Sequence, residues 1–257
     1  MILTTEMKAR RTPVLIVDLR ENPGGQSVFA DILEYFLYPL DSTMAVDHGY
    51  QVSRFSPLYF QSHSADTIEK VRTRTTADFQ MGDLDFTGLD QWRHLRAVPP
   101  SPAERQRLSQ EFLDQMRGLP TFAKILDQGG WNAAWTPRVV VLTSARTYSA
   151  AFDAVLQLRA HGAAVVGVPS SQAANCFIDV VGFRLAHSRL TGTISFKWSV
   201  GLPQDPQNGT LLRPDRELSY ADDRAFKFDP NATILLAIDF LSKPHPAAPG
   251  GLALLRP

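Results

Sequence analysis

Two segments far apart in the 257-residue chain hold the residue types that acyl-transfer chemistry requires. Gly24 and Gly25 follow the apolar run of residues 14–19, and Ser149 follows the apolar run of residues 139–142. Bare glycine N–H groups can donate hydrogen bonds to a developing oxyanion, and a serine hydroxyl can attack a carbonyl carbon. We therefore predict an acyl-transfer site in which Ser149 is the nucleophile and the N–H of Gly24 or Gly25 is one oxyanion donor.

The position of Ser149 at the start of a predicted helix supplies a second donor and also an alternative interpretation. The backbone N–H of Ala150 lies in the first helical turn, where the helix dipole favours negative charge. We therefore predict Ala150 as the second oxyanion donor. Serine is equally a common N-cap residue, whose hydroxyl accepts a hydrogen bond from the backbone of its own helix. Spacing alone leaves both interpretations open.

The hydrophobic pattern predicts the elements that position these residues. The predicted elements are strands at residues 14–19, 139–142 and 164–168, helices at 27–37, 149–160 and 231–241, and a hairpin at 177–200. A strand, a helix and a strand in close succession predict a right-handed parallel crossover. Adjacent parallel strands end at the same edge of a sheet, so we expect Ser149 and the glycines to meet there. Asp18 and Arg20 predict an ion pair that holds the glycine turn.

Four blocks of sequence carry a family resemblance. "VDLRENPGG" is similar to a family pattern DLRxNxGG, and "TYSAAFDAVLQLRAHGAAVVGVPS" to a pattern TaSAaExvaxaLqxxgxAxvvGexT. "AANCFIDVVGFRLAHS" and "LRPDRELS" are similar to two further blocks, so that the match covers residues 13–40 and 137–241. The chain resembles the tail-specific (C-terminal processing) serine proteases, including their tricorn-core-like relatives. In that resemblance Ser149 stands at the nucleophile.

The resemblance implies the fold and the division of the chain. We expect an α/β protein with a Clp-protease/crotonase-like core, a mixed, partly parallel sheet and flanking helices, plus a mixed insertion. The predicted core comprises residues 1–38 and 137–242, the insertion residues 39–136, and a flexible tail residues 243–257. We expect the insertion to pack at the sheet edge that carries the site, either as part of a cleft or as plain cover or an oligomer contact. Its best helix is predicted at residues 102–117, with Ser101 as N-cap.

The same resemblance shows that the groups needed for proton transfer differ. The family's lysine falls at Ala173, the glutamate of the tricorn-like relatives at Val168, and the glutamate of the SAxE motif at Phe152. A serine nucleophile requires a proton acceptor within hydrogen-bond reach. Among the histidines, His48 and His63 of the insertion are the candidate bases. The others are expected at surface or capping positions; they are His94, His161, His187 and His245.

Composition excludes several other classes of protein. The formal net charge is zero and no basic stripe is present, so we expect neither nucleic acid nor an anionic membrane as a partner. One cysteine excludes an intrachain disulfide framework, and no histidine spacing indicates a metal site; we expect no cofactor. No apolar stretch reaches about 18 residues, and "MILTTEMKARR" lacks the order of a signal peptide. A soluble chain is expected, and its localisation is left open.

Three functions follow from these observations. The first is a serine peptidase-like hydrolase that acts on peptides or proteins through an acyl-enzyme on Ser149, whose base is not assigned. The second is a catalytically inactive homologue that binds a peptide or a partner. The third is an acyl-CoA-type enzyme on the same superfold, which would require basic residues beside the glycine turn. The oligomeric state is left open.

Overall fold

The computed structural model describes residues 2–38, 49–73, 79–81, 93–97, 101–118, 120, 123–124, 136–202 and 209–243. The contacts within the chain separate it into two compact units. The first unit comprises residues 1–47, 101–173 and 211–257, and the second comprises residues 48–100 and 174–210.

A four-stranded parallel sheet forms the centre of the first unit. Its strands, in spatial order, are β1 (Val14–Asp18), β5 (Arg138–Thr143), β6 (Ala164–Gly167) and β9 (Arg216–Glu217). The central strand β5 is buried from Val139 to Thr143, as its continuous run of valine and leucine predicts for a strand covered on both faces. Asp18 pairs with Leu142, so β1 and β5 end side by side.

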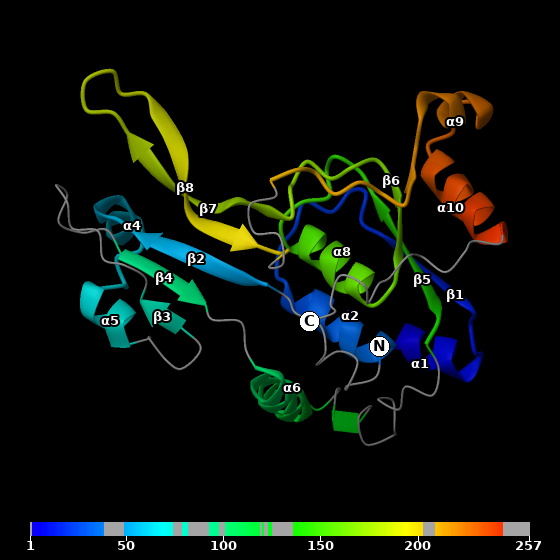
Figure 1. The fold of residues 1–257 in the computed structure, drawn as a ribbon, viewed down its shortest axis with the longest axis horizontal. Helices are drawn as coiled ribbons and strands as arrows, with labels where there is room; N and C mark the ends of the chain where they lie inside the picture. The colour runs from blue at the N-terminus through cyan, green and yellow to red at the C-terminus, as the bar shows by residue number, and fades with distance from the viewer. Residues whose placement is uncertain are drawn as a thin grey trace. The chain divides into compact units, whose positions relative to one another are not determined.

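Helices cover both faces of this sheet, as Figure 1 shows for α8 and α10. Helix α10 (Ala232–Ser242) packs its Leu236 and Phe240 against Val140, Leu142 and Val166. Helix α8 (Ala150–Ala160) contacts β5 and β6 and lies beside α2 (Val28–Leu37). Side chains alternate along a strand, so the residues between those that contact α10 face α8.

The first unit also contains α1 (Ile2–Ala9), α6 (Pro102–Arg117) and α9 (Tyr220–Ala225). The predicted N-cap of α6 is confirmed, because the Glu104 N–H donates to Ser101 Oγ at 3.2 Å.

An antiparallel sheet forms the second unit. Its five described strands, in spatial order, are β3 (Phe79–Met81), β4 (Arg93–Ala97), β2 (Tyr50–Phe55), β8 (Thr191–Val200) and β7 (Asn175–Arg184). Two short helices, α4 (Pro57–Ser62) and α5 (Ile68–Thr73), belong to the same unit. The core of this unit consists of Phe55, Tyr59, Val71 and Val181.

The α/β class, the parallel sheet and the flanking helices are confirmed, with two differences. The parallel and antiparallel strands described here lie in separate sheets rather than in one mixed sheet. The predicted hairpin is present as β7 and β8, but it groups with residues 48–100 because β8 pairs with β2. The division into core and insertion and the placement of the insertion at the sheet edge stay predictions. Residues 244–257 of the predicted tail lie outside the described residues.

Candidate active site

Ser149 sits in a strained backbone conformation at the junction of β5 and α8. Its φ is 54° and its ψ is −129°, a region that residues other than glycine rarely occupy. Its side chain is exposed, and its hydroxyl makes no capping hydrogen bond to α8. Ser149 stands at the N-cap position of α8, but its side chain does not supply the hydrogen bond that a serine cap usually makes. A sharp strand-to-helix turn that leaves a serine hydroxyl exposed is the arrangement that a nucleophile requires.

The glycine turn lies directly against Ser149, as the parallel strands predict. A Cβ built on Gly24 would lie 2.6 Å from the Cβ of Ser149 and 2.9 Å from the carbonyl oxygen of Tyr148. Gly24 also has a φ of +112°, which favours glycine. The Tyr148 N–H donates to the carbonyl oxygen of Asn22 at 3.2 Å and joins the two turns. Only glycine fits at position 24 without displacing the Ser149 turn.

Some backbone N–H groups of the two turns donate hydrogen bonds within the described residues, and others do not. The Gly24 N–H donates to Asn22 Oδ1 at 3.0 Å, and the Ser149 N–H donates to Gln172 Oε1 at 2.6 Å. The N–H groups of Gly25 and Ala150 make no hydrogen bond with another residue of the described ranges. Ala150 also begins α8, where the helix dipole adds partial positive charge. Of the two predicted glycine donors, Gly25 is thus the one whose N–H is unused.

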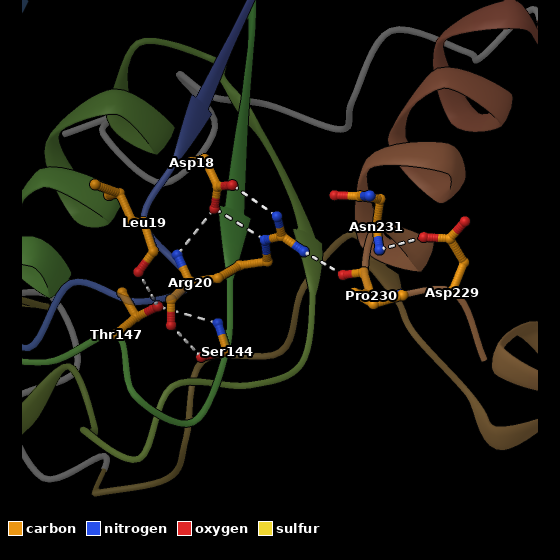
Figure 2. Close-up of polar contacts among 8 residues, drawn as sticks. All are labelled: Asp18, Leu19, Arg20, Ser144, Thr147, Asp229, Pro230 and Asn231. Carbon is orange, nitrogen blue, oxygen red and sulfur yellow. Dashed lines mark hydrogen bonds and ion pairs between the residues drawn. The ribbon is translucent and has the colours of Figure 1, made fainter.

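An ion pair fixes the strand end from which the glycine turn leaves, as Figure 2 shows. Arg20 Nη2 lies 2.7 Å from Asp18 Oδ2, and Arg20 Nη1 donates to the carbonyl oxygen of Pro230 at 3.2 Å. The hydrogen bonds from Arg20 hold the pKa of the Asp18 carboxyl below its usual value, since they favour the ionised form. The predicted Asp18–Arg20 pair is confirmed, and it also ties β1 to the segment that precedes α10.

Two hydroxyls join the end of β1 to the turn that leads to Ser149 (Figure 2). Ser144 Oγ donates to the carbonyl oxygen of Arg20 at 2.5 Å. Thr147 Oγ1 donates to the carbonyl oxygen of Leu19 at 2.8 Å and accepts from the Ser144 N–H at 3.0 Å. These bonds satisfy backbone carbonyl groups that a strand end would otherwise leave unpaired. They hold the two turns together through groups that play no part in chemistry.

Ser170 and Gln172 support the Ser149 turn from the segment after β6. Ser170 Oγ donates to the carbonyl oxygen of Thr147 at 2.5 Å and accepts from the Gln172 N–H at 3.0 Å. Both side chains are buried, and Gln172 in turn accepts from the Ser149 N–H. The sequence analysis missed both residues. Ser170 had a signal, because it stands at the threonine of the family's GexT pattern; Gln172 had none.

Comparison with known proteins shows the family to which the chain belongs. The sequence matches Peptidase family S41 over residues 3–177, which is more than half of the chain. The chain belongs to peptidase family S41. This membership confirms the resemblance to tail-specific proteases that the motifs predicted. No curated protein matches the sequence.

Two solved structures are similar to this S41 chain. One is a Bacteroides fragilis NCTC 9343 protein assigned to the S41 proteases, at 15% identity and a TM-score of 0.44; the alignment covers 94% of this chain and 48% of that one. The other is a lipoprotein from Streptococcus agalactiae, at 12% identity and a TM-score of 0.35, with 88% and 60% of the two chains covered. The S41 chain therefore spans about half the length of the first of these relatives.

At the family's proton-transfer positions this S41 chain carries apolar residues, and each of them is part of the packed core or of a backbone contact. Phe152 is 1% exposed and belongs to the core beneath α8. Ala173 is buried and forms an isolated antiparallel bridge with Leu211. Val168 is partly exposed, and its N–H donates to the carbonyl oxygen of Thr143 at 3.1 Å. None of the three side chains can accept the proton of Ser149.

The histidines do not supply a base within the described part of the first unit. His161 ends α8, and at about 1.5 Å per residue the helix separates it from Ser149 by about 16–18 Å. His161 is the C-cap residue of α8, so the capping position expected for it is confirmed, and its side chain is buried at 2% exposure. His63 lies in the second unit, where it stacks on Tyr59 at 4.3 Å between ring centroids. His48 lies outside the described residues, and both candidates stay predictions.

Other chemistry finds little support at this site. Among the described residues, no group of three or more His, Cys, Asp and Glu side chains could hold a metal ion. Arg20 and Arg146, the arginines on the two turns, are paired with Asp18 and Glu21. Within the described ranges, no helix is long and apolar enough to cross a membrane.

Proposed function

We propose that this chain is a serine peptidase-like hydrolase of family S41 that forms an acyl-enzyme on Ser149. The observation that carries the proposal is the strained turn of Ser149, which holds an exposed serine against the glycine turn and leaves its hydroxyl without a capping hydrogen bond to α8. Strain of about 1–3 kcal/mol persists only where the surroundings impose it, and it is concentrated at active sites. A serine that served only as a helix cap would have no need of it. The proposed framework is a Clp-protease/crotonase-like core.

The proposed chemistry uses three groups of the site. Ser149 Oγ attacks the carbonyl carbon of a peptide bond, and the hydroxyl proton passes to a base. The N–H groups of Ala150 and Gly25 bind the oxyanion of the tetrahedral intermediate. Collapse of the intermediate breaks the C–N bond, and the amine leaves with the proton. Water then hydrolyses the ester and restores the Ser149 hydroxyl.

The base is the part of the proposal that the described residues of the first unit do not supply. His48 and His63 are the proposed candidates, since a serine nucleophile requires an acceptor within hydrogen-bond reach. Loss of such a base lowers the rate by several powers of ten, although an oxyanion hole by itself retains some catalysis. We therefore expect hydrolysis by this chain alone to be slow or undetectable, while Ser149 still reacts with a strong electrophile.

A second function has its own support in the apolar positions. Val168, Ala173 and Phe152 replace the groups that would move protons, and Phe152 and Ala173 are buried as ordinary core residues. This pattern fits a homologue that binds a peptide or partner without cleaving it. The acyl-CoA alternative has no comparable support, since the arginines beside the two turns are engaged in ion pairs.

Labelling with a fluorophosphonate probe tests the proposal. A fluorophosphonate phosphonylates an activated serine hydroxyl and releases fluoride, and intact mass spectrometry detects the adduct. We expect slow, saturable formation of one adduct on Ser149 in the wild type and none in Ser149→Ala. Ser171→Ala, which removes the side-chain hydroxyl of the exposed residue before Gln172, is the matched control and should label as the wild type does.

Three results decide between the alternatives. An adduct that persists in Ser149→Ala would remove Ser149 from its role. Rapid labelling together with rapid peptide hydrolysis would show that a base is present, and His48→Ala and His63→Ala would then identify it. Complete resistance to the probe, together with saturable binding of a peptide, would favour the binding homologue.

A further inference from the structure

A row of three polar contacts joins α2 to α8 along their length. Ser27 Oγ donates to Asp153 Oδ2 at 3.2 Å. One turn further along both helices, Gln157 Nε2 donates to Asp31 Oδ1 at 2.9 Å. At the far end, His161 Nε2 and Glu34 Oε1 share a hydrogen bond of 2.5 Å. These six side chains are called the polar row.

The spacing of the polar row fixes the alignment of the two helices. Residue numbers rise together in the three pairs, so α2 and α8 run in the same direction, and Figure 1 shows them side by side. Positions about four residues apart lie on one face of a helix. A displacement of one helix by a single turn would separate all three pairs at once. Apolar side chains alone would tolerate such a shift more easily, because their contacts are not directional.

The far end of the polar row is a buried contact between Glu34 and His161. The side chains of Glu34 and His161 are each 2% exposed, and the His161 ring stacks on Tyr38 with 4.0 Å between centroids. Burial, together with the charge of Glu34, raises the pKa of Tyr38, so the tyrosine stays neutral beside the pair.

The composition of the polar row is poorly suited to stability alone. A buried pair of this kind is often no more stabilising than apolar residues of the same volume, and its best-attested role is to specify register. The middle pair, Asp31 and Gln157, is also poorly suited to stability, because Gln157 Oε1 is buried without a hydrogen-bond partner among the described residues. An unpaired buried acceptor is unfavourable. The polar row therefore needs a reason other than stability.

The two helices begin at the two halves of the candidate site. Helix α2 follows the turn of Gly24 and Gly25, and α8 begins at the residue after Ser149. Gly24 approaches Ser149 so closely that a single added methyl group would clash, so the two turns are tightly packed against each other. Any shift of α2 along α8 is transmitted to the distance between the Gly25 N–H and the Ser149 hydroxyl.

We propose that the polar row sets the register of the glycine turn against Ser149, and that Glu34 and His161 are its principal positioning residues. The inference rests on the proposed acyl-transfer role of Ser149. Neither residue touches the reacting atoms, because His161 lies at the opposite end of α8 from Ser149. Their effect is on the alignment of the oxyanion donors with the nucleophile.

The decisive variant is the double substitution Glu34→Leu/His161→Leu, which keeps the volume but removes the directional contact. Fluorophosphonate labelling is resolved into probe affinity (KI) and maximal rate (kinact), and melting temperature is measured beside it. We expect an unchanged melting temperature and KI, with kinact lowered about tenfold or more, because misalignment of reacting groups acts on the chemical step. Glu34→Gln, whose carbonyl oxygen can still accept from His161, should label as the wild type does.

Two further variants complete the design. Asp239→Leu/Lys243→Leu removes an exposed ion pair from α10 and should change neither rate nor register. If the Glu34/His161 double variant does not fold, Asp31→Leu/Gln157→Leu tests the middle pair instead, since neither residue is fully buried. A folded double variant of either pair with wild-type kinact would overturn the inference.

Hydrogen exchange separates this inference from the proposed function. In the double-leucine variant, we expect faster amide exchange in residues 19–27 and 144–150 than in the wild type, at unchanged melting temperature. If the wild type gains no adduct on Ser149, the proposed function fails and exchange alone decides the inference. Unchanged exchange in both turns would refute the positioning role whatever the result with the probe.

Discussion

The turn of residues 144–150 and the segment of residues 167–173 adjoin each other but contribute differently to the candidate site. The turn holds Ser149 in a strained conformation and leaves its hydroxyl exposed. The segment supports that turn through Ser170 and Gln172, yet its residues at the family's proton-transfer positions are Val168 and Ala173. Among the described residues, an exposed serine at a strained turn is thus combined with apolar side chains at the family's proton-transfer positions. Backbone geometry and proton transfer depend on different side chains, so one can be present without the other.

The largest expected effect comes from restoring an amine at the family's lysine position. Ala173→Lys should accelerate formation of the Ser149 adduct by about 10²-fold, because a positioned general base contributes about 10²–10⁴-fold. Ala173→Met, which has a similar length and no amine, is the matched control. Equal rates of adduct formation in the lysine and methionine variants would show that an amine at position 173 does not serve as a proton acceptor for Ser149.

A methyl group on the glycine turn should disrupt the turn of residues 144–150. Gly24→Ala is expected to lower the free energy of unfolding by about 2–5 kcal/mol and to prevent labelling, because the new Cβ clashes with Ser149 and the φ is unfavourable. Gly25→Ala has the strained φ of +144° but an open space around the added Cβ. Urea unfolding of both variants should therefore give a smaller loss for Gly25→Ala. Equal losses would mean that the close approach of Gly24 to Ser149 is unimportant.

The support that residues 167–173 give to the Ser149 turn is tested at the side-chain amide of Gln172. Gln172→Ala leaves the Ser149 N–H without its acceptor, which should lower the free energy of unfolding by about 1–3 kcal/mol. We also expect slower labelling, since the strained turn would relax. The exposed neighbour Ser171 provides the control Ser171→Ala. A Gln172→Ala protein with the stability and labelling rate of the wild type would contradict the supporting role.

The smallest effect is expected at the Asp18–Arg20 ion pair. Asp18→Asn should lower the free energy of unfolding by about 0.2–1 kcal/mol at pH 7, because the carboxylate is partly exposed and screened by water. The pKa of Asp18 is depressed in the folded state, so its contribution is present above the ordinary pKa and is lost as the pH falls through the folded pKa. Urea unfolding between pH 7 and about pH 3 should show the two proteins converging. A difference that grows toward low pH would reverse the sign of this linkage.

The sequence alone determined the local secondary-structure elements and the meeting of Ser149 with the glycine turn. Periodicity in β1, β5, α2 and α8 depends on neighbouring residues, so it indicates each element without knowledge of the rest. Parallel strands that end at one edge then predict the meeting of Ser149 with the glycine turn, which the structure shows at Gly24. The membership in family S41 was equally readable, because the motif blocks are contiguous stretches of sequence.

The tertiary structure alone decided the contacts between segments that are distant in sequence. Gln172 reaches the Ser149 N–H across 23 positions, and His161 reaches Glu34 across 127. No local pattern predicts that either side chain makes its long-range contact. The hairpin likewise joined the second unit because β8 pairs with β2, which lies far upstream. Pairings of this kind depend on which surfaces remain unpaired once the elements have formed, and that information resides in packing rather than in the periodicity of any one segment.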